Sequence, residues 1–199
     1  MTRAAPYNRD AALESAMQLF WNKGFHATSL KDLEVALGMK PGSIYSAFSS
    51  KENLYLLALE KYFDESLAGF QASMDRAVSP LSGLADHFRS YTRLAPDDVA
   101  RQACMLTKTL IDTRSTDPEL LQHSRDYLLA MQCEFASAFA RAIAQGELPK
   151  TANPERLARR FQANVSALRF ELAKGVEAAE FAALAEDMAT EIEQLKLSA

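Results

Sequence analysis

Three helix starts of the same form are spaced along the chain, at Ser79-Pro80, Asp117-Pro118 and Asn153-Pro154. In each, a residue that caps helix N-termini precedes a proline at the first helical position, where a backbone N–H is not needed. A fourth start, Pro96-Asp97-Asp98, is acidic in its first turn, as the helix dipole favours. Little of the chain has the alternating pattern of a strand. The sequence therefore predicts an all-α fold.

Apolar residues at helical spacing, separated by glycines and prolines, predict nine helices. In the first, Leu13, Met17 and Phe20 share one face and Gly24 supplies the stop. Ser49 and Glu52 predict a capping box for a long fourth helix. The expected helices span residues 9–23, 29–36, 41–48, 51–77, 80–94, 97–113, 118–145, 154–174 and 177–197.

These helices predict two domains, a three-helix bundle over residues 1–50 and a larger bundle over residues 51–199. Helix 51–77 is expected to connect them rigidly. Apolar residues make up 48% of the chain and charged residues 24%, which is ordinary for a globular protein. Residues 1–51 carry a net charge of +2 and the remainder −6. This mild imbalance permits a nucleic-acid partner for the first domain without proving one.

The chain is expected to stay in the cytoplasm. It has no run of eighteen apolar residues, and residues 1–6 lack the apolar stretch of a secretory signal. Its two cysteines, Cys104 and Cys133, are therefore expected to be reduced thiols.

Residues 28–51 have the pattern of a helix-turn-helix, with motif helices at about 29–48. Gly38 can take the positive φ of a sharp turn between two short helices. The apolar residues of the pair, Leu30, Leu33, Leu37, Ile44 and Phe48, are expected to pack on the first helix. In a helix-turn-helix the second helix enters the DNA major groove.

The residues that remain outside this core suit DNA. Tyr45, Lys51, Thr28 and Ser29 carry groups that bind phosphate oxygens, and Gly42 lets the backbone approach closely. Lys40 and Ser43 are candidates for base contacts. The alternative for Tyr45 and Lys51 is an ordinary packed ring and a solvated amine. The expected DNA-binding residues are Thr28, Ser29, Lys40, Pro41, Gly42, Ser43, Tyr45, Ser46 and Lys51.

The chain resembles the tetracycline-repressor (TetR) family of transcriptional regulators. The resemblance covers about residues 9–62 and rests on Gly24-Phe25, Thr28-Ser29-Leu30, Leu37-Gly38-Met39, Gly42-Ser43-Ile44-Tyr45 and Phe48-x-x-Lys51-Glu52-x-Leu54. It implies a three-helix DNA-binding domain followed by a ligand-binding and dimerisation domain. Members of the family commonly repress genes until a small molecule releases them. Beyond residue 62 only the helix layout and the chain length match.

Three positions depart from the family pattern. Glu34 stands where many members have a small Ala, and Ala47 where a His often contacts phosphate. Lys40 replaces a capping Ser or Thr, a change that costs roughly 0.5–2 kcal/mol of helix stability. Pro41 offsets part of this cost by presetting the first helical turn. The departures leave the operator sequence open.

The last two expected helices each carry an apolar stripe, which is either core of one chain or, as the resemblance implies, a four-helix dimer interface. A homodimer is favoured because one short recognition helix touches too few bases to specify an operator. Two recognition helices about 34–36 Å apart would read a near-palindromic operator. The expected interface residues are Leu157, Phe161, Val165, Leu168, Leu172, Phe181, Leu184, Met188, Ile192 and Leu195.

The resemblance also implies a cavity for a small-molecule effector among helices 80–94, 97–113 and 118–145. Apolar stripes there otherwise indicate ordinary core. Helix 51–77 is expected to carry the movement caused by ligand binding to the DNA-binding domain. The expected pocket residues are Phe88, Tyr91, Met105, Leu106, Thr109, Tyr127, Met131, Phe135 and Asn164.

Three other functions compete with that of a ligand-released repressor. An enzyme is not expected, because the sequence has no nucleophile elbow, phosphate-binding glycine loop, zinc signature or evident carboxylate pair. A helical adaptor would leave Gly42-Ser43-Ile44-Tyr45 unexplained. Cys104 offers an alternative, a redox- or electrophile-responsive regulator of the same fold. Glu119 and His123 share a helix face, but without a second such pair no metal and no cofactor is expected.

Overall fold

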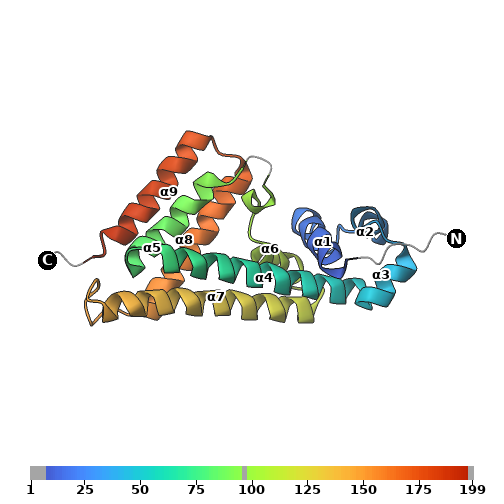
Figure 1. The fold of residues 1–199 in the computed structure, drawn as a ribbon, viewed down its shortest axis with the longest axis horizontal. Helices are drawn as coiled ribbons and strands as arrows, with labels where there is room; N and C mark the ends of the chain where they lie inside the picture. Colours follow the sequence, from blue (N-terminus) through green and yellow to red (C-terminus); the bar gives the residue numbers. More distant parts are fainter. Residues whose placement is uncertain (1–7, 96–97, 197–199) are drawn as a thin grey trace. The chain divides into compact units, whose positions relative to one another are not determined.

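The computed structural model describes residues 8–95 and 98–196, and over these residues it contains nine α-helices and no strand (Figure 1). No helix in the described ranges is both long and apolar enough to span a bilayer. Two short 3-10 turns, Tyr91–Arg93 and Val99–Arg101, lie between α5 and α6. The helices are α1 (Arg9–Lys23), α2 (Leu30–Leu37), α3 (Pro41–Phe48), α4 (Lys51–Arg76), α5 (Pro80–Ser90), α6 (Met105–Asp112), α7 (Pro118–Ala144), α8 (Pro154–Lys174) and α9 (Ala178–Glu193).

The chain forms two compact units. The first contains residues 8–64 and 105–125, and the second contains residues 65–95, 98–104 and 126–196. Helices α4 and α7 each begin in the first unit and continue into the second. The functional boundary expected at residue 50 stays a prediction, since these units are defined by packing.

Aromatic rings form the core of the first unit. Tyr55 of α4 meets Phe20 and Phe25 with ring centroids 4.7 and 5.0 Å apart, both edge to face. The Tyr55 hydroxyl lies 2.7 Å from the hydroxyl of Thr109 in α6. Lys108, also in α6, donates to the carbonyl oxygen of Trp21 at 2.5 Å, near the end of α1. Helix α6 therefore packs with the N-terminal helices.

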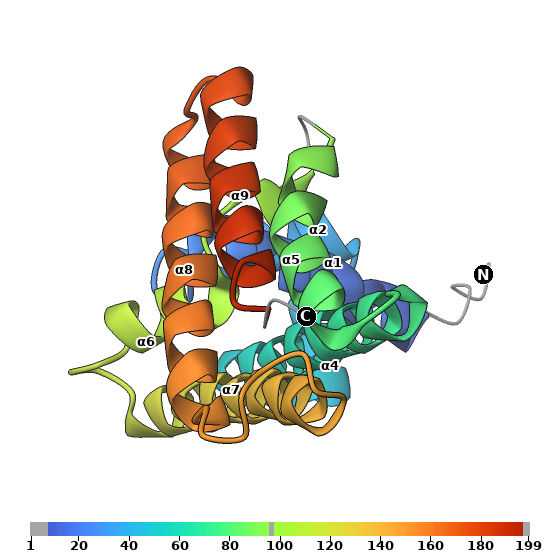
Figure 2. The same cartoon turned by 90° about the vertical axis from the view of Figure 1, so that its left-hand side faces the viewer.

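The second unit is a bundle in which α5, α8 and α9 lie side by side (Figures 1 and 2). Phe135 of α7 and Phe161 of α8 are buried, with ring centroids 4.9 Å apart. The buried carboxylate of Glu147 accepts from the backbone N–H of Leu81 at 3.0 Å. A negative group at this position stabilises the N-terminus of α5.

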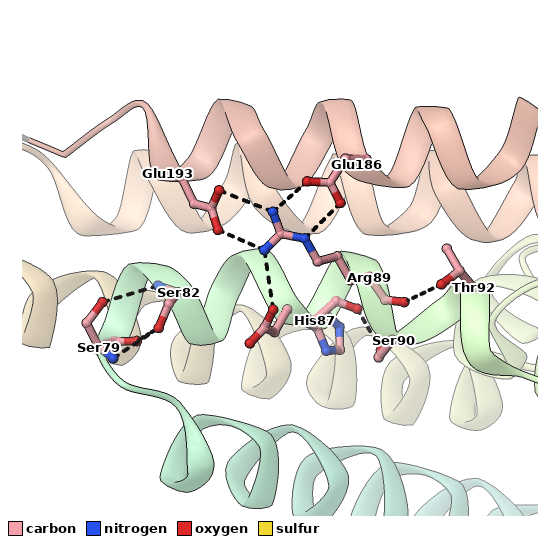
Figure 3. Close-up of polar contacts among 9 residues, drawn as sticks. Ser79, Ser82, His87, Arg89, Ser90, Thr92, Glu186 and Glu193 are labelled. Atoms are coloured by element: carbon pink, nitrogen blue, oxygen red, sulfur yellow. Dashed lines mark hydrogen bonds and ion pairs between the residues drawn. The ribbon is translucent and has the colours of Figure 1, made fainter.

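A charged network joins α5 to α9 (Figure 3). The Arg89 guanidinium donates to Glu186 at 2.7 and 2.8 Å and to Glu193 at 2.7 and 3.1 Å. Asp86 lies 3.3 Å from the same guanidinium. At the start of α5, Ser79 and Ser82 form a capping box. Hydrogen bonding to Arg89 lowers the pKa values of Glu186 and Glu193.

Two local predictions about helix starts were wrong. The helix expected over residues 97–113 begins only at Met105, and a 3-10 turn stands within its predicted first half. The expected start at Pro96-Asp97-Asp98 lies mostly outside the described residues. The cap of α4 is Ser50, whose hydroxyl accepts from the Asn53 N–H at 3.0 Å, and not Ser49.

Candidate nucleic-acid interface

The entry to α2 is held by a complete capping box. The Asp32 carboxylate accepts from the Ser29 N–H at 2.8 Å, and the Ser29 hydroxyl oxygen accepts from the Asp32 N–H at 3.2 Å. Lys23 at the end of α1 lies 2.8 Å from Asp32. This lysine and the Ser29 donors hold the pKa of Asp32 well below its usual range. An ionised carboxylate of α2, paired with a lysine of α1, therefore joins the two helices.

Gly38 makes the turn between α2 and α3, as the sequence predicted. Its φ of 61° and ψ of 28° lie in the left-handed region, which disfavours a Cβ atom. The N–H groups of Gly38 and Met39 both donate to the Glu34 carbonyl. Met39 is buried and anchors the turn. The direction of α3 is thus set by backbone bonding and one apolar contact.

Helix α3 has one buried face and one exposed face. Ile44 and Phe48 are 2% and 1% exposed, whereas Tyr45 is 48% exposed. Ser43 and Ser46 are exposed as well. Gly42 also lies on the exposed surface, and a Cβ atom added to it would meet no heavy atom within 4 Å. The exposed face is therefore free of large apolar groups other than the Tyr45 ring.

Lys40 is the N-cap of α3 and makes no side-chain cap hydrogen bond, while Pro41 occupies the first turn. This agrees with the missing cap inferred from the sequence. The Lys40 side chain is exposed. An uncapped helix start leaves backbone N–H groups oriented outward, and such groups bind anions.

The junction of α3 and α4 places a second cation near this face. Ser49 ends α3 with a φ of 67°, and the Asn53 side chain donates to the Phe48 carbonyl at 2.9 Å. The Lys51 ammonium lies 4.5 Å from the centroid of the Phe25 ring. Partial burial lowers the pKa of Lys51. The half-buried Lys51 is thus held in one place by the ring beneath it.

Two of the expected DNA-binding residues have partners inside the chain. Thr28 is 1% exposed and its hydroxyl donates to the Gly24 carbonyl at 2.7 Å. We therefore remove Thr28 from the candidate contacts, because a buried hydroxyl with a partner is unavailable to phosphate. The exposed Ser29 hydroxyl donates to Asp32 at 2.7 Å. The seven others, Lys40, Pro41, Gly42, Ser43, Tyr45, Ser46 and Lys51, lie together on α3 and its two ends.

One candidate was missed by sequence reasoning. The guanidinium of Arg9, in the first turn of α1, lies 5.5 Å from the centroid of the Phe48 ring. The side chain is exposed and places a third cation beside the C-terminal end of α3. A basic residue at the start of the first helix was the available signal, but only the fold brings it to α3.

The stripes expected to form a dimer interface lie partly in the core. Five of the ten residues are at most 7% exposed, because contacts within the single chain already cover their side chains. These are Phe161, Leu168, Leu172, Phe181 and Ile192. The others, Leu157, Val165, Leu184, Met188 and Leu195, are half-buried.

The expected pocket residues are divided between the units. Met105, Leu106 and Thr109 are buried in the first unit. The remaining six, Phe88, Tyr91, Tyr127, Met131, Phe135 and Asn164, belong to the second unit. Of the cysteines, Cys104 is half-buried and Cys133 exposed.

Comparison with known proteins agrees with this geometry. Residues 12–58 match the family described as bacterial regulatory proteins, tetR family, and residues 77–171 match a tetracyclin repressor-like C-terminal domain. The HTH-type transcriptional repressor ComR of Escherichia coli is 32% identical over 151 residues, which cover 74% of this chain and 70% of ComR.

Two solved structures extend the comparison to the fold. A TetR family regulator from Cytophaga hutchinsonii superposes with a TM-score of 0.83 at 20% identity, covering 96% of both chains. A cysteine mutant of the regulator CifR, complexed with 26-base-pair operator DNA, has a TM-score of 0.77 at 27% identity. That superposition covers 95% of this chain and 98% of CifR.

Proposed function

We propose that this chain, which belongs to the TetR family of transcriptional regulators, represses its target genes as a homodimer and is released by a small-molecule effector. It is a DNA-binding regulator of the helix-turn-helix type. Its place of action would be the cytoplasm. Its relatives are transcriptional regulators and not enzymes.

The exposed face of α3 is the observation that carries the proposal. Ser43, Tyr45 and Ser46 project from a helix whose opposite face is buried. In the proposed complex these side chains meet base edges and phosphates in the major groove. In the same complex Lys40 and Lys51, which flank the helix, bind backbone phosphates.

The proposed dimer uses a different face of α8 from the buried stripe. Ala163, Ala167 and Phe170 lie along it at helical spacing, and Phe170 is 59% exposed. Small residues let a second helix approach closely, and an exposed aromatic ring is a frequent interface anchor. Pairing through this face would give the two recognition helices that a near-palindromic operator requires.

Release would proceed through the elements that continue from one unit into the other. Helix α4 is one such element, and the chain entering α6 is another. Lys108 and Thr109 bind groups of α1 and α4 directly. A shift of α6 would therefore reorient the DNA-binding helices.

The salt dependence of DNA binding tests this proposal. Fluorescence anisotropy with the gene's own upstream DNA should show that Lys51→Ala makes the negative slope of log K against log salt shallower by about one. Lys51→Arg should retain the slope, because it keeps the charge. Lys150→Ala, which removes an exposed lysine from the second unit, is the control and should leave the slope unchanged. An equal slope for wild type and Lys51→Ala would remove Lys51 from the interface.

A further inference from the structure

A buried arginine and two polar aromatic side chains meet inside the second unit. Arg169 of α8 is 8% exposed, and its Nη2 donates to the Gln102 carbonyl at 3.5 Å. Its guanidinium carbon lies 5.7 Å from the centroid of the Tyr91 ring. The Tyr91 hydroxyl in turn lies 3.3 Å from Nε2 of His87. Three hydrogen-bonding groups thus converge from α5, the turn after it, and α8.

Aromatic rings surround this polar cluster. The His87 ring lies 5.3 Å from Phe70 and 5.9 Å from Phe161, measured between centroids. Phe135 is 6.0 Å away. In Figure 3, His87 leaves α5 in a direction different from that of Arg89, which reaches α9. Aromatic rings therefore pack on several sides of His87, the apolar environment in which a flat ring is stabilised.

The cluster carries the positive charge of Arg169. Burial lowers the pKa of His87 to about 4, and the charge of Arg169 adds to this effect, so the imidazole is neutral at pH 7. Burial raises the pKa of Tyr91, and the charge of Arg169 opposes that rise. His87 and Tyr91 nonetheless retain accessible surface.

We propose that Arg169, Tyr91 and His87 bind the carboxylate of the effector, whose body is an aromatic or similarly flat apolar group. This rests on the proposed function, because it assigns the chemistry of the effector. A carboxylate accepts hydrogen bonds from a guanidinium, a phenol and a neutral imidazole N–H. Charge-assisted bonds to arginine are about 2.7–2.9 Å long and stronger than a long bond to a carbonyl.

The position of Gln102 connects such binding to regulation. Its carbonyl accepts from Arg169, and α6 begins at Met105, three residues later. A carboxylate that takes over the guanidinium would release the Gln102 carbonyl. The segment leading to α6 would then move, which is the shift that the proposed release requires.

Isothermal titration calorimetry of the full chain tests the inference with three acids: benzoate, phenylacetate and indole-3-acetate. Each is compared with its uncharged primary amide. We expect at least one acid to bind saturably and at least about tenfold more tightly than its amide. This comparison needs no variant, so it holds even if a substitution of Arg169 impairs folding. Equal binding of acids and amides, or binding of none of the three acids, would overturn the inference.

Variants then locate the binding site. Arg169→Gln should weaken binding of the preferred acid at least about tenfold and leave its amide unaffected. Arg169→Lys should retain part of the affinity. Arg160→Gln, which neutralises an exposed arginine of the same helix, is the matched control. If Arg169→Gln binds the acid as wild type does, Arg169 only holds the Gln102 turn and the inference fails.

Anisotropy with upstream DNA, on the same samples without acid, separates the two proposals. DNA binding without acid binding leaves the regulator standing and removes the carboxylate site. Acid binding without DNA binding would support the carboxylate site and count against the proposed regulator.

Discussion

At the scale of single residues, burial decides which polar groups serve the fold and which are available to DNA. Thr28 and Tyr45 were both expected to contact phosphate. Thr28 is 1% exposed and Tyr45 is 48% exposed. The sequence alone does not predict this difference in exposure, because both hydroxyls lie within one motif. The contacts of Thr28 arise from how the end of α1 packs.

Replacement of Thr28 by Val tests this assignment. Val keeps the shape and removes the donor to the Gly24 carbonyl, so the free energy of unfolding should fall by about 1–2 kcal/mol. DNA affinity of the folded variant should match that of wild type. Thr151→Val, at an exposed position, should change stability by less than about 0.5 kcal/mol. A stable Thr28→Val variant that had lost DNA affinity would return Thr28 to the contact set.

At the scale of helices and turns, the predictions that depend only on neighbouring residues were confirmed. Gly38 takes the left-handed conformation, and Pro41, Pro80, Pro118 and Pro154 each begin a helix. The helix expected from residue 97 was wrong because apolar periodicity does not reveal competing contacts. The side chain of Asp98 bonds the Ala100 N–H and starts a 3-10 turn instead.

The partner against which each apolar stripe packs is the second feature that the sequence did not predict. The residues along α8 have helical periodicity, but a stripe does not say whether its partner lies in the same chain. Phe161 and Leu168 are buried by contacts within the chain, whereas Phe170 is exposed. The sequence therefore predicted the helices and the DNA-binding motif, whereas their burial required the fold.

Gly42 provides a test of the close approach of α3 to DNA. Nothing lies within 4 Å of a Cβ at Gly42, so Gly42→Ala should leave unfolding unchanged or stabilise the chain by up to about 1 kcal/mol. DNA affinity should fall at least about tenfold, because the added methyl meets the groove. Gly69→Ala in α4, equally unobstructed, should leave DNA binding intact. Equal DNA affinities of the two variants would argue against a close backbone approach.

The Arg89 network predicts a pH dependence of stability. The pKa values of Glu186 and Glu193 are lowered in the folded state from an ordinary value of 4.5. Their contribution is therefore present above pH 4.5 and is lost as pH falls through the lowered values. Urea denaturation should show wild type more stable than Arg89→Gln near neutral pH, with the difference shrinking as the pH falls below 4.5.

An exposed arginine provides the control for this series. Arg93→Gln should differ little from wild type at any pH, since its side chain is exposed. A stability difference between wild type and Arg89→Gln that stays constant with pH would contradict the role of the two glutamates.

At the scale of the whole molecule, the proposal requires a dimer. Phe170→Glu places a charge at the proposed interface, so it should weaken dimerisation at least about tenfold in light scattering coupled to size-exclusion chromatography. Leu129→Glu is a matched control, because Leu129 is 58% exposed and Phe170 59%. It should remain dimeric. A wild-type chain that is monomeric at all concentrations, or an unaffected Phe170→Glu dimer, would rule out this interface.

The most direct test of DNA recognition through α3 is an anisotropy titration. The gene's own upstream DNA is titrated with the wild-type chain and with the double variant Ser43→Ala/Tyr45→Ala. Both residues are exposed, so the double variant should unfold like wild type. Wild type should form a saturable complex that scrambled DNA of equal length does not displace. The double variant should bind roughly tenfold to a hundredfold more weakly. Equal affinities for native and scrambled DNA, or equal binding by both proteins, would contradict recognition through α3.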